Sequence, residues 1–253
     1  MEFTKMEGLG NDFVMLDGPV VLDSETVAAL CDRRRGVGAD GVLIVSPLGP
    51  ARVKMEYMNA DGSPAEMCGN GLRCVARRAV DLGLVDGPDF VVETAVGPRR
   101  VSVLTPDLIR VELGPVEVAA RDEMIDGYAV RSVNVGNPHA VIFVEDPAAS
   151  DVEGVGSRLE HNAAFPGGAN VEFGAALSSD SIAMRVWERG VGETLACGTG
   201  AAAVVAAAAA TGRSASVATV RLPGGLLDVE ISNGVAWITG PATTVYSGVW
   251  TAG

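Results

Sequence analysis

The sequence contains little lysine, histidine or aromatic residue. Of its 253 residues, two are lysines (Lys5 and Lys54), two are histidines, and Phe, Trp and Tyr together make up 5%. Schiff-base chemistry therefore has two candidate residues, and both lie outside the cysteine motifs described below. Basic charge is also scarce, because 19 Lys and Arg are set against 32 Asp and Glu, a net charge of −13. We expect neither a nucleic-acid nor an anionic-membrane surface, since both need clustered basic residues.

Cysteine and long apolar runs are limited as well. The four cysteines lie at positions 31, 68, 74 and 197, in a chain long enough to fold without disulfides. No charged and apolar leader opens the sequence, and the most apolar run, 201–210, is about half the length that spans a bilayer. We expect a cytoplasmic protein whose cysteines are reactive or buried. No metal site is expected, because the nearest pair, Cys68 and Cys74, is spaced more widely than the roughly two to four residues of zinc motifs.

The sequence repeats itself once. The segment EYMNADGSPAEMCGNG, from Glu56, aligns without gaps to RVWERGVGETLACGTG, from Arg185, and places Cys68 129 residues before Cys197. Two further landmarks recur in the same order, Gly10-Asn11 with Gly136-Asn137 at a displacement of 126 residues, and Ala39-Asp40 with Ala169-Asn170 at 130. A nearly constant displacement of half the chain predicts a duplicated fold.

Each repeat indicates several strands and one helix. Runs rich in β-branched residues, bounded by Gly, Pro, Asn or Asp, predict strands over 41–48, 89–96, 99–104, 108–113, 139–145 and 181–188. Apolar periodicity predicts helices over 72–84 and 201–212, the second apolar on every side and therefore buried. We expect an α/β (α+β) protein of two pseudo-symmetric halves, 1–115 completed by 241–253, and 116–240. Each would be a curved mixed sheet around a central helix, with the active site in the cleft between them.

Each predicted helix follows a Cys-Gly-x-Gly segment, C-G-N-G at Cys68 and C-G-T-G at Cys197. A helix N-terminus presents unpaired N–H groups and a positive dipole end, which bind a carboxylate and lower the pKa of a thiol. Two such thiols on opposite sides of one molecule suit the inversion of a stereocentre, because one removes a proton and the other returns a proton to the opposite face. The helix N–H groups would stabilise the carbanionic intermediate.

Structural interpretations compete with this one. A single cysteine at a tight turn is more often a small buried residue, but two at matched positions before matched helices favour chemistry. Cys31 and Cys74 lack this context and are expected to pack in the interior. Arg33 to Arg35 are expected to form a solvated helix end, and His161 to lie on the surface.

Three longer motifs, MNADGSPAEMCGNGLRC, NVGNPHAV and ERGVGETLACGTGA, make the chain resemble the diaminopimelate epimerase family over nearly its whole length. The resemblance implies a two-halved fold, no cofactor and no metal, a homodimer, and a place in lysine and peptidoglycan precursor biosynthesis. It implies that Cys68 and Cys197 interconvert LL- and meso-2,6-diaminopimelate as a thiolate and thiol pair. In the LL-to-meso direction Cys197 would accept the proton and Cys68 would donate one.

Other roles follow from the resemblance by position. His139 and Glu188 match catalytic positions that hold the reacting amino group, and Tyr246 matches a dimer contact. The expected substrate-binding residues are Asn11, Asn59, Gly69, Asn70, Asn137, Asn170, Glu188, Arg189, Gly198 and Thr199. A substrate that is zwitterionic at both ends needs neutral amides, one cation and one anion, and Arg189 and Glu188 supply the two charges. Taken alone, Asn137 and Asn170 are more typical of turns, and His139 of a hydrogen-bonded structural histidine.

Gly41 departs from the family pattern, in which many members carry Gln. Any part that this Gln takes in substrate binding would pass here to backbone, water or another side chain. The sequence therefore predicts the proton-transfer chemistry more firmly than it predicts selectivity for the distal end of the substrate.

Four other functions compete with diaminopimelate epimerisation. A racemase or epimerase of the same fold acting on proline, hydroxyproline or histidine would use identical chemistry, and the charged distal site at Arg189 argues against it. The paired cysteines disfavour an isomerase that uses a carboxylate. Retention of both cysteines disfavours a non-catalytic amino-acid-binding protein. A pyridoxal phosphate enzyme would need a lysine in the site.

Overall fold

The computed structural model describes residues 1–65 and 67–251, so the last two residues of the expected C-terminal segment lie outside it. Contacts divide the chain into two units, Met1–Val111 with the segment from Gly240 onward, and Glu112–Thr239. The helices of the first unit are α1 (Ser24–Cys31) and α2 (Gly69–Asp81). Those of the second are the short 3-10 helix η1 (Pro147–Ala149), α3 (Val152–Glu160) and α4 (Gly198–Ala210).

Strands make up most of both units. The first unit has β1 (Glu2–Gly8), β2 (Asn11–Asp17), β3 (Gly41–Gly49), β4 (Arg52–Asn59), β5 (Asp89–Thr94), β6 (Gly97–Thr105), β18 (Thr243–Val249) and the first half of β7 (Leu108–Pro115). The second has β8 (Glu117–Val118), β9 (Glu123–Ile125), β10 (Tyr128–Asn134), β11 (Pro138–Phe143), β12 (Asn170–Ser178), β13 (Ser181–Glu188), β14 (Gly192–Thr194), β15 (Val217–Leu222), β16 (Gly225–Ser232) and β17 (Val235–Gly240). The six predicted strands correspond to β3, β5, β6, β7, β11 and β13.

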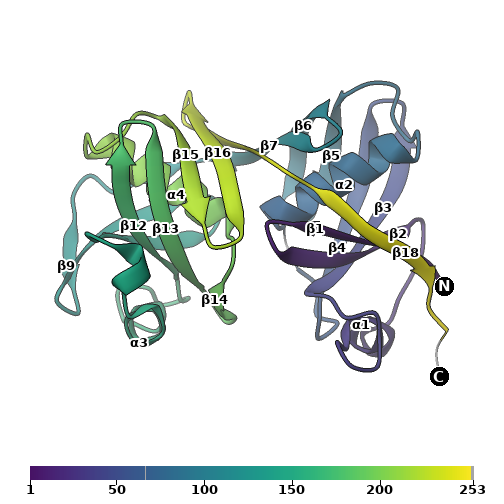
Figure 1. Ribbon diagram of the computed structural model, residues 1–253, viewed down its shortest axis with the longest axis horizontal. Coiled ribbons are helices and arrows are strands. Elements are labelled where there is room, and N and C mark those ends of the chain that lie inside the picture. Colours follow the sequence, from purple (N-terminus) through teal and green to yellow (C-terminus); the bar gives the residue numbers. More distant parts are fainter. Residues whose placement is uncertain (66, 252–253) are drawn as a thin grey trace. The chain divides into compact units, whose positions relative to one another are not determined.

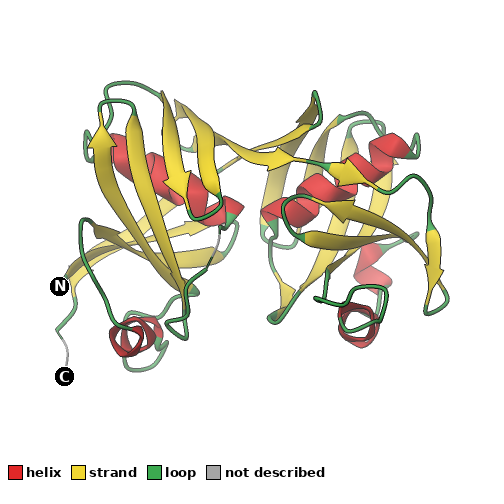
Figure 2. Ribbon diagram, turned by 180° about the vertical axis from the view of Figure 1, so that it is seen from behind, coloured by secondary structure: helices red, strands yellow, loops and turns green. Residues whose placement is uncertain are grey.

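The two units have the same strand connections. In the first, β2 pairs parallel with β3, β3 antiparallel with β4, and β4 parallel with β5, followed by antiparallel β6 and β7. In the second, β11, β12, β13, β15, β16 and β17 repeat this order and these directions. Each mixed sheet surrounds one helix, α2 or α4 (Figure 2). The predicted architecture of two similar halves around central helices is confirmed.

In each unit, one strand pairs with chain that follows the repeat of the other unit. β18 comes after β17 in sequence, but it pairs antiparallel with β1 of the first unit (Figure 1). In the second unit β10 is the equivalent of β1, and it pairs with β8 and β9, which come after β7. This exchange explains why the first unit includes both ends of the chain.

Strand register corrects one of the sequence alignments. Gly41 pairs with Phe13 on one side and Asn59 on the other. Asn170 pairs with His139, and β13 continues the same register towards Glu188. Gly41 is therefore the counterpart of Asn170, and the predicted match of Asp40 with Asn170 is wrong by one residue. The Ala-Asp and Ala-Asn strings look alike, but strand pairing decides which backbone positions are equivalent.

The central helices begin three residues earlier than the apolar periodicity predicted. α2 starts at Gly69 and α4 at Gly198, so each Cys-Gly-x-Gly segment forms the cap and first turn. Polar and glycine residues carry no periodic signal, which is why the first turn was missed. α4 is buried from Gly200 to Ala208, as its apolar composition predicted. None of the described helices has the length and apolar character needed to cross a membrane.

Candidate active site

Two cysteines cap the central helices. Cys68 is the N-cap of α2 and Cys197 that of α4, both with extended backbone (φ −132° and −123°). The first helical hydrogen bonds run from Leu72 N to Cys68 O (2.8 Å) and from Ala201 N to Cys197 O (2.9 Å). The N–H groups of a first helical turn have no partner within the helix, and the positive end of the dipole lies at the cap. Each unit therefore combines a thiol with a site suited to a carboxylate.

Asn11 is the immediate neighbour of Cys68. The Cys68 thiol donates to Asn11 Oδ1 (3.3 Å), and Asn70 Nδ2 donates to the same oxygen (3.4 Å). Cys68 is only partly buried, and the structure brings it together with two of the predicted substrate-binding amides. The carbonyl of Asn11 thus points at the start of α2.

A charged network holds Asn11 in this orientation. Asp40 Oδ2 accepts a hydrogen bond from Asn11 Nδ2 (2.7 Å), and Asp40 Oδ1 lies 2.6 Å from Arg33 Nη2. Arg33 also contacts Asp12 Oδ1 (2.7 Å), and Lys5 Nζ lies 2.7 Å from Asp12 Oδ2. Burial raises the pKa of Asp12, but hydrogen bonds and charges of Arg33 and Lys5 outweigh burial and lower the pKa to about 2. Arg33 is exposed as predicted, yet it also belongs to this network, which the sequence did not indicate.

A buried guanidinium lies behind Cys68. The Arg73 side chain is 0% exposed. Its Nε donates to Pro241 O (3.0 Å), its Nη2 to Asn70 Oδ1 (3.0 Å) and its Nη1 to Gly69 O (3.5 Å). Each guanidinium nitrogen has an oxygen partner, so the buried cation is compensated and the first turn of α2 is held in place.

Cys197 has a different environment. It is 6% exposed, its Sγ accepts a hydrogen bond from Gly200 N (3.4 Å), and the sulfur lies 3.5 Å from Thr199 Oγ1. Burial raises the pKa of the Cys197 thiol well above its ordinary value, and the carboxylates of Glu188 and Glu172 raise it further. The predicted lowering of the thiol pKa at each helix start is therefore wrong for Cys197, because burial and two carboxylates outweigh the helix end.

Glu188 lies at the end of β13 and interacts with the Cys197 thiol. Burial raises the pKa of Glu188, while hydrogen bonds from Thr194 and Cys197 act in the opposite direction. The Thr194 hydroxyl donates to Glu188 Oε1. The counterpart in the first unit is Asn59, at the end of β4, whose Nδ2 donates to Ser63 Oγ (3.0 Å). The repeat therefore places an acid at the end of β13 and an amide at the equivalent end of β4.

A chain of hydrogen bonds leads from Cys197 into the interior. Asn137 Nδ2 donates to Thr199 Oγ1 (3.4 Å), and Asn137 Oδ1 lies 2.9 Å from His139 Nε2. His139 Nδ1 lies 2.6 Å from Glu172 Oε1, and both of these side chains are 0% exposed. Glu172 Oε2 accepts no hydrogen bond from any residue that the structure describes.

Asn170 and Arg189 meet at the turn after β13. Asn170 Oδ1 accepts from Arg189 N (3.0 Å), and Asn170 Nδ2 donates to Pro138 O (3.2 Å). The guanidinium of Arg189 is exposed and donates to Gly167 O (3.1 Å). A hollow of about 480 Å³ lies there, lined by Arg189 and the loop that follows α3. Both predicted binding residues thus belong to one polar corner of the second unit.

Gly41 has no room for a side chain. A Cβ atom at Gly41 would lie 2.5 Å from Met58 O and 2.7 Å from Tyr57 Cε2, both closer than real contacts. The Tyr57 ring fills the space beside the Gly41 backbone. Glycine is therefore required by the packing of β3 against β4.

The other cysteines and His161 lie away from the helix starts. Cys31 and Cys74 are buried, and burial raises the pKa of Cys31 to about 11 and that of Cys74 to about 12, so both remain thiols at neutral pH. His161 is exposed, as predicted. Tyr246, on β18, is 45% exposed and packs edge-on against Phe3 with ring centroids 5.8 Å apart.

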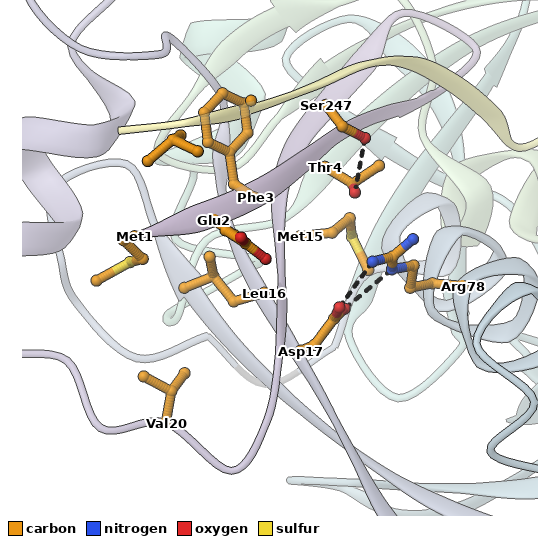
Figure 3. Close-up of a pocket in the computed structure, with 12 residues that line it drawn as sticks. Met1, Glu2, Phe3, Thr4, Met15, Leu16, Asp17, Val20, Arg78 and Ser247 are labelled. Atoms are coloured by element: carbon orange, nitrogen blue, oxygen red, sulfur yellow. Dashed lines mark hydrogen bonds and ion pairs between the residues drawn. The ribbon is translucent and has the colours of Figure 1, made fainter. Parts of the chain in front are cut away.

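A hollow of about 600 Å³ on the first unit contains none of the predicted site residues. It is lined by β1, β2, β18 and Arg78, whose guanidinium donates to both carboxylate oxygens of Asp17 at 2.9 and 2.7 Å (Figure 3). The hydroxyls of Thr4 and Ser247 lie 3.1 Å apart on the same wall. Across the described part of the chain, no three His, Cys, Asp or Glu side chains gather as metal ligands would.

Among the residues of these surroundings that were not found from the sequence are Glu172, Arg73 and Asp40. Glu172 is the single charged residue in the apolar run 170–177, and a charge inside such a strand is a signal that could have identified it. Arg73 follows the Cys-Gly-Asn-Gly motif directly after Leu72, within an amphipathic helix where arginine is normally exposed. Asp40 carried no signal beyond its place in the repeat.

Solved structures define the fold class. A phenazine biosynthesis protein from Bacillus anthracis superimposes with a TM-score of 0.76 at 14% identity, covering 99% of each chain. A hydroxyproline epimerase from Agrobacterium vitis, solved with trans-4-hydroxy-L-proline, gives 0.72 at 17% identity, covering 98% of this chain and 90% of that one. Identities this low show the fold alone, and the fold is the two-halved architecture shared with these proteins.

Sequence comparison then defines the family. The family model described as diaminopimelate epimerase matches residues 3–119 and 131–245. Proteins named diaminopimelate epimerase from Desulforudis audaxviator and Moorella thermoacetica are each 43% identical to the chain, the first over 99% and the second over 98% of both lengths. The chain belongs to the diaminopimelate epimerase family, a family of isomerases.

Proposed function

We propose that the protein interconverts LL- and meso-2,6-diaminopimelate by moving a proton with two cysteines and no cofactor. The observation that carries the proposal is the pair of cysteines, Cys68 and Cys197, each capping the central helix of its unit in a chain of this family. Either cysteine alone would be an ordinary residue at the N-cap of a helix. Two at equivalent positions are what inversion of a stereocentre requires.

The proposed reaction balances one proton removed against one returned. A thiolate takes the α-proton, which breaks the C–H bond and leaves a carbanion conjugated with the carboxylate. The thiol of the other cysteine then gives its proton to the opposite face. N–H groups of the first helical turns stabilise the carboxylate as its charge grows. General acid–base catalysis of this kind supplies about 10²–10⁴-fold per group.

The raised pKa of Cys197 assigns it the proton in the free enzyme. A protonated Cys197 is ready to act as the donor, which is its part in the meso-to-LL direction. In the LL-to-meso direction Cys197 must first release this proton to solvent, and binding of a substrate ammonium beside Glu188 favours that release because it offsets the nearby carboxylate charge.

Substrate recognition is assigned to the polar groups around the helix starts. We propose that Gly69, Asn70, Gly198 and Thr199 hold the reacting carboxylate and amine through the first turns of α2 and α4. At the distal end, the Arg189 guanidinium would bind the carboxylate, and the amides of Asn11, Asn59, Asn137 and Asn170 would complete the neutral lining. Glu188 would bind an ammonium group.

We further propose a homodimer that uses β18, in the cytoplasm, with the reaction serving lysine and peptidoglycan precursor biosynthesis. Three apolar side chains of β18 are more than 40% exposed: Val245, Tyr246 and Val249. An exposed strand with this composition is suited to a partner copy. The Tyr246→Asp variant should then elute as a monomer in size-exclusion chromatography with light scattering; a wild-type monomer would contradict the proposal.

A substrate panel tests the proposed activity. The purified protein is incubated with LL-diaminopimelate, L-proline, trans-4-hydroxy-L-proline and L-histidine, and the stereoisomers are separated by chiral chromatography. We expect equilibration of LL- with meso-diaminopimelate and no inversion of the other three. Inversion of proline or hydroxyproline without any change in diaminopimelate would overturn the substrate, and inversion of none would overturn the activity.

A further inference from the structure

The buried pair of His139 and Glu172 has apolar counterparts in the first unit. Gly41 and Asn170 are equivalent in register, so Leu43 on β3 corresponds to Glu172 on β12, and Phe13 corresponds to His139. Phe13 and Leu43 are 0% exposed, as His139 and Glu172 are. The same backbone therefore closes its interior with two apolar side chains in one unit and with an ionisable pair in the other.

The ionisable pair is unfavourable for folding. A buried carboxylate needs partners for both oxygens, and Glu172 Oε2 has none among the described residues. Buried ion pairs replaced by well-packed apolar residues leave proteins as stable or more stable. Because the first unit shows the apolar solution on the same fold, stability does not account for Glu172.

Glu172 lies directly under the first turn of α4. A Cβ atom at Gly200 would lie 2.8 Å from Glu172 Oε1, and in the first unit a Cβ atom at Gly71 would lie 3.0 Å from Leu43 Cδ1. Only glycine at this helix position lets the strand side chain approach so closely. The carboxylate therefore sits beside the backbone that carries the Cys197 cap.

His139 transmits the position of Glu172 to the thiol. Both ring nitrogens are engaged, Nδ1 by Glu172 and Nε2 by the Asn137 carbonyl, and the ring is 0% exposed. A Nε2 that donates to Asn137 Oδ1 turns the amide so that Nδ2 faces Thr199 Oγ1. Through these contacts His139 orients Asn137 and Thr199. Glu188 contacts the thiol separately, from the end of β13.

We propose that Glu172 is a positioning residue for Cys197, which fixes the Thr199 hydroxyl beside the thiol through His139 and Asn137 and places a carboxylate against the first turn of α4. The catalytic consequence rests on the proposed epimerase function, whereas the effect on the thiol does not. Among the described residues, the charges that act on Cys197 are Glu188 from β13 and Glu172 from β12, and His139 from β11 acts on Glu188. The first turn of α4 adds Gly198, Thr199 and Gly200, which carry no charge.

The thiol itself supplies the first test. In a Cys68→Ala background, Cys197 is alkylated with iodoacetamide across pH, and peptide mass spectrometry separates its adduct from any adducts of buried Cys31 and Cys74, whose pKa values are also raised. Adding Glu172→Gln removes a neighbouring negative charge, so the alkylation midpoint should fall by roughly one pH unit. The matched control is Glu193→Gln, which removes a carboxylate paired with Arg185 at the edge of the same unit and should leave the midpoint unchanged. An unchanged midpoint in Glu172→Gln would overturn the inference.

Kinetics of the Glu172→Gln variant, with both cysteines present, give the second test. We expect kcat to fall roughly 10–100-fold, KM to stay within about threefold, and the pH profile of kcat to shift towards lower pH. Loss of activity accompanied by a large fall in Tm and a changed circular dichroism spectrum would show a structural role and overturn the inference. Wild-type kcat with an unchanged pH profile would overturn it as well.

Replacing the buried pair of the second unit by the two apolar residues found at the equivalent positions of the first unit separates its effect on stability from its effect on activity. The double variant His139→Phe with Glu172→Leu should keep its Tm or gain about 2–4 °C, and should lose at least about 100-fold in kcat. If it fails to fold, the alkylation and kinetics of Glu172→Gln decide. A wild-type protein inactive on diaminopimelate would remove the proposed function, whereas the alkylation midpoint would still support or overturn the role of Glu172.

Discussion

The starts of α2 and α4 have the same backbone conformation, but they differ in the charged side chain that is buried behind each cysteine. Behind Cys68 lies Arg73, a cation whose nitrogens all have oxygen partners. Behind Cys197 lies Glu172, an anion with one oxygen unpartnered among the described residues. The hydrogen bonds of Arg73 hold the first turn of α2 in place, while Glu172 pairs with His139 through one oxygen and acts on the thiol. A duplicated fold therefore does not imply duplicated chemistry at its two equivalent sites.

The largest expected effect is loss of either thiol. Cys68→Ala and Cys197→Ala should each lower epimerisation by at least about 10³-fold, because inversion needs both a base and an acid however different their surroundings are. Chiral chromatography of diaminopimelate measures the loss. Cys31→Ala, a buried cysteine outside the helix starts, serves as the control and should keep most of the activity. Near-normal turnover in either of the first two variants would contradict the claim that both cysteines are needed for inversion.

The next largest effect is on the free energy of unfolding, which should respond differently to loss of Arg73 and to loss of Glu172. Arg73→Ala leaves Asn70 Oδ1 and Pro241 O without their donor and opens a cavity, so the free energy of unfolding should fall by about 3–5 kcal/mol. The double variant His139→Phe with Glu172→Leu, which replaces the whole buried pair by the apolar residues of the first unit, should change it by less than about 1 kcal/mol or increase it. Urea titration followed by circular dichroism measures both. Equal losses in the two variants would mean that Glu172 is as structural as Arg73.

A smaller effect is expected from the glycines over these strands. In Gly200→Ala the new Cβ would press on Glu172 Oε1, and in Gly71→Ala it would meet Leu43 Cδ1, an apolar methyl at the limit of contact. We expect kcat to fall roughly tenfold for Gly200→Ala and to stay within about twofold for Gly71→Ala, because only the first displaces the chain leading to Cys197. Similar kcat values in the two variants would contradict this difference.

The smallest effect concerns acid stability in the network that orients Asn11. The pKa of Asp12 is about 2 in the folded protein against an ordinary value of 3.8. A lowered folded-state pKa stabilises above pH 3.8, and this contribution is lost as pH falls towards 2. The urea midpoint of the wild type should therefore decline over this range more steeply than that of Asp12→Asn. Parallel declines would show that Asp12 does not couple to folding.

Local sequence signals predicted the fold and the cysteines that precede the central helices, although apolar periodicity missed the first turn of each helix. The repeat located Cys68 and Cys197 as helix caps because the motif, the turn and the helix are contiguous in the chain. The environment of Cys197 could not be predicted in this way, since Glu172, Glu188 and His139 come from three strands that are brought together only by sheet pairing. For the same reason the dipole argument gave the wrong direction for the Cys197 pKa, because a helix end is local and burial is not.

The register error and the missed arginine have similar origins. Asp40 resembles Asn170 in its string of neighbours, but the strand register makes Gly41 the equivalent position. Arg73 lies on an amphipathic helix, and its burial depends on the carbonyl of Pro241, far away in sequence. Motif spacing therefore predicts which residues begin an element, while charges buried by tertiary packing have to be read from the structure.

Solvent deuterium tests the two-thiol mechanism most directly. LL-diaminopimelate is converted in D₂O, the reaction is stopped at early times, and mass spectrometry measures deuterium in the separated substrate and product. Two thiols on opposite faces predict one deuterium at the inverted carbon of meso product, with the remaining LL substrate unlabelled. Deuterium entering recovered substrate as fast as product would show that one base serves both faces, which would contradict paired roles for Cys68 and Cys197.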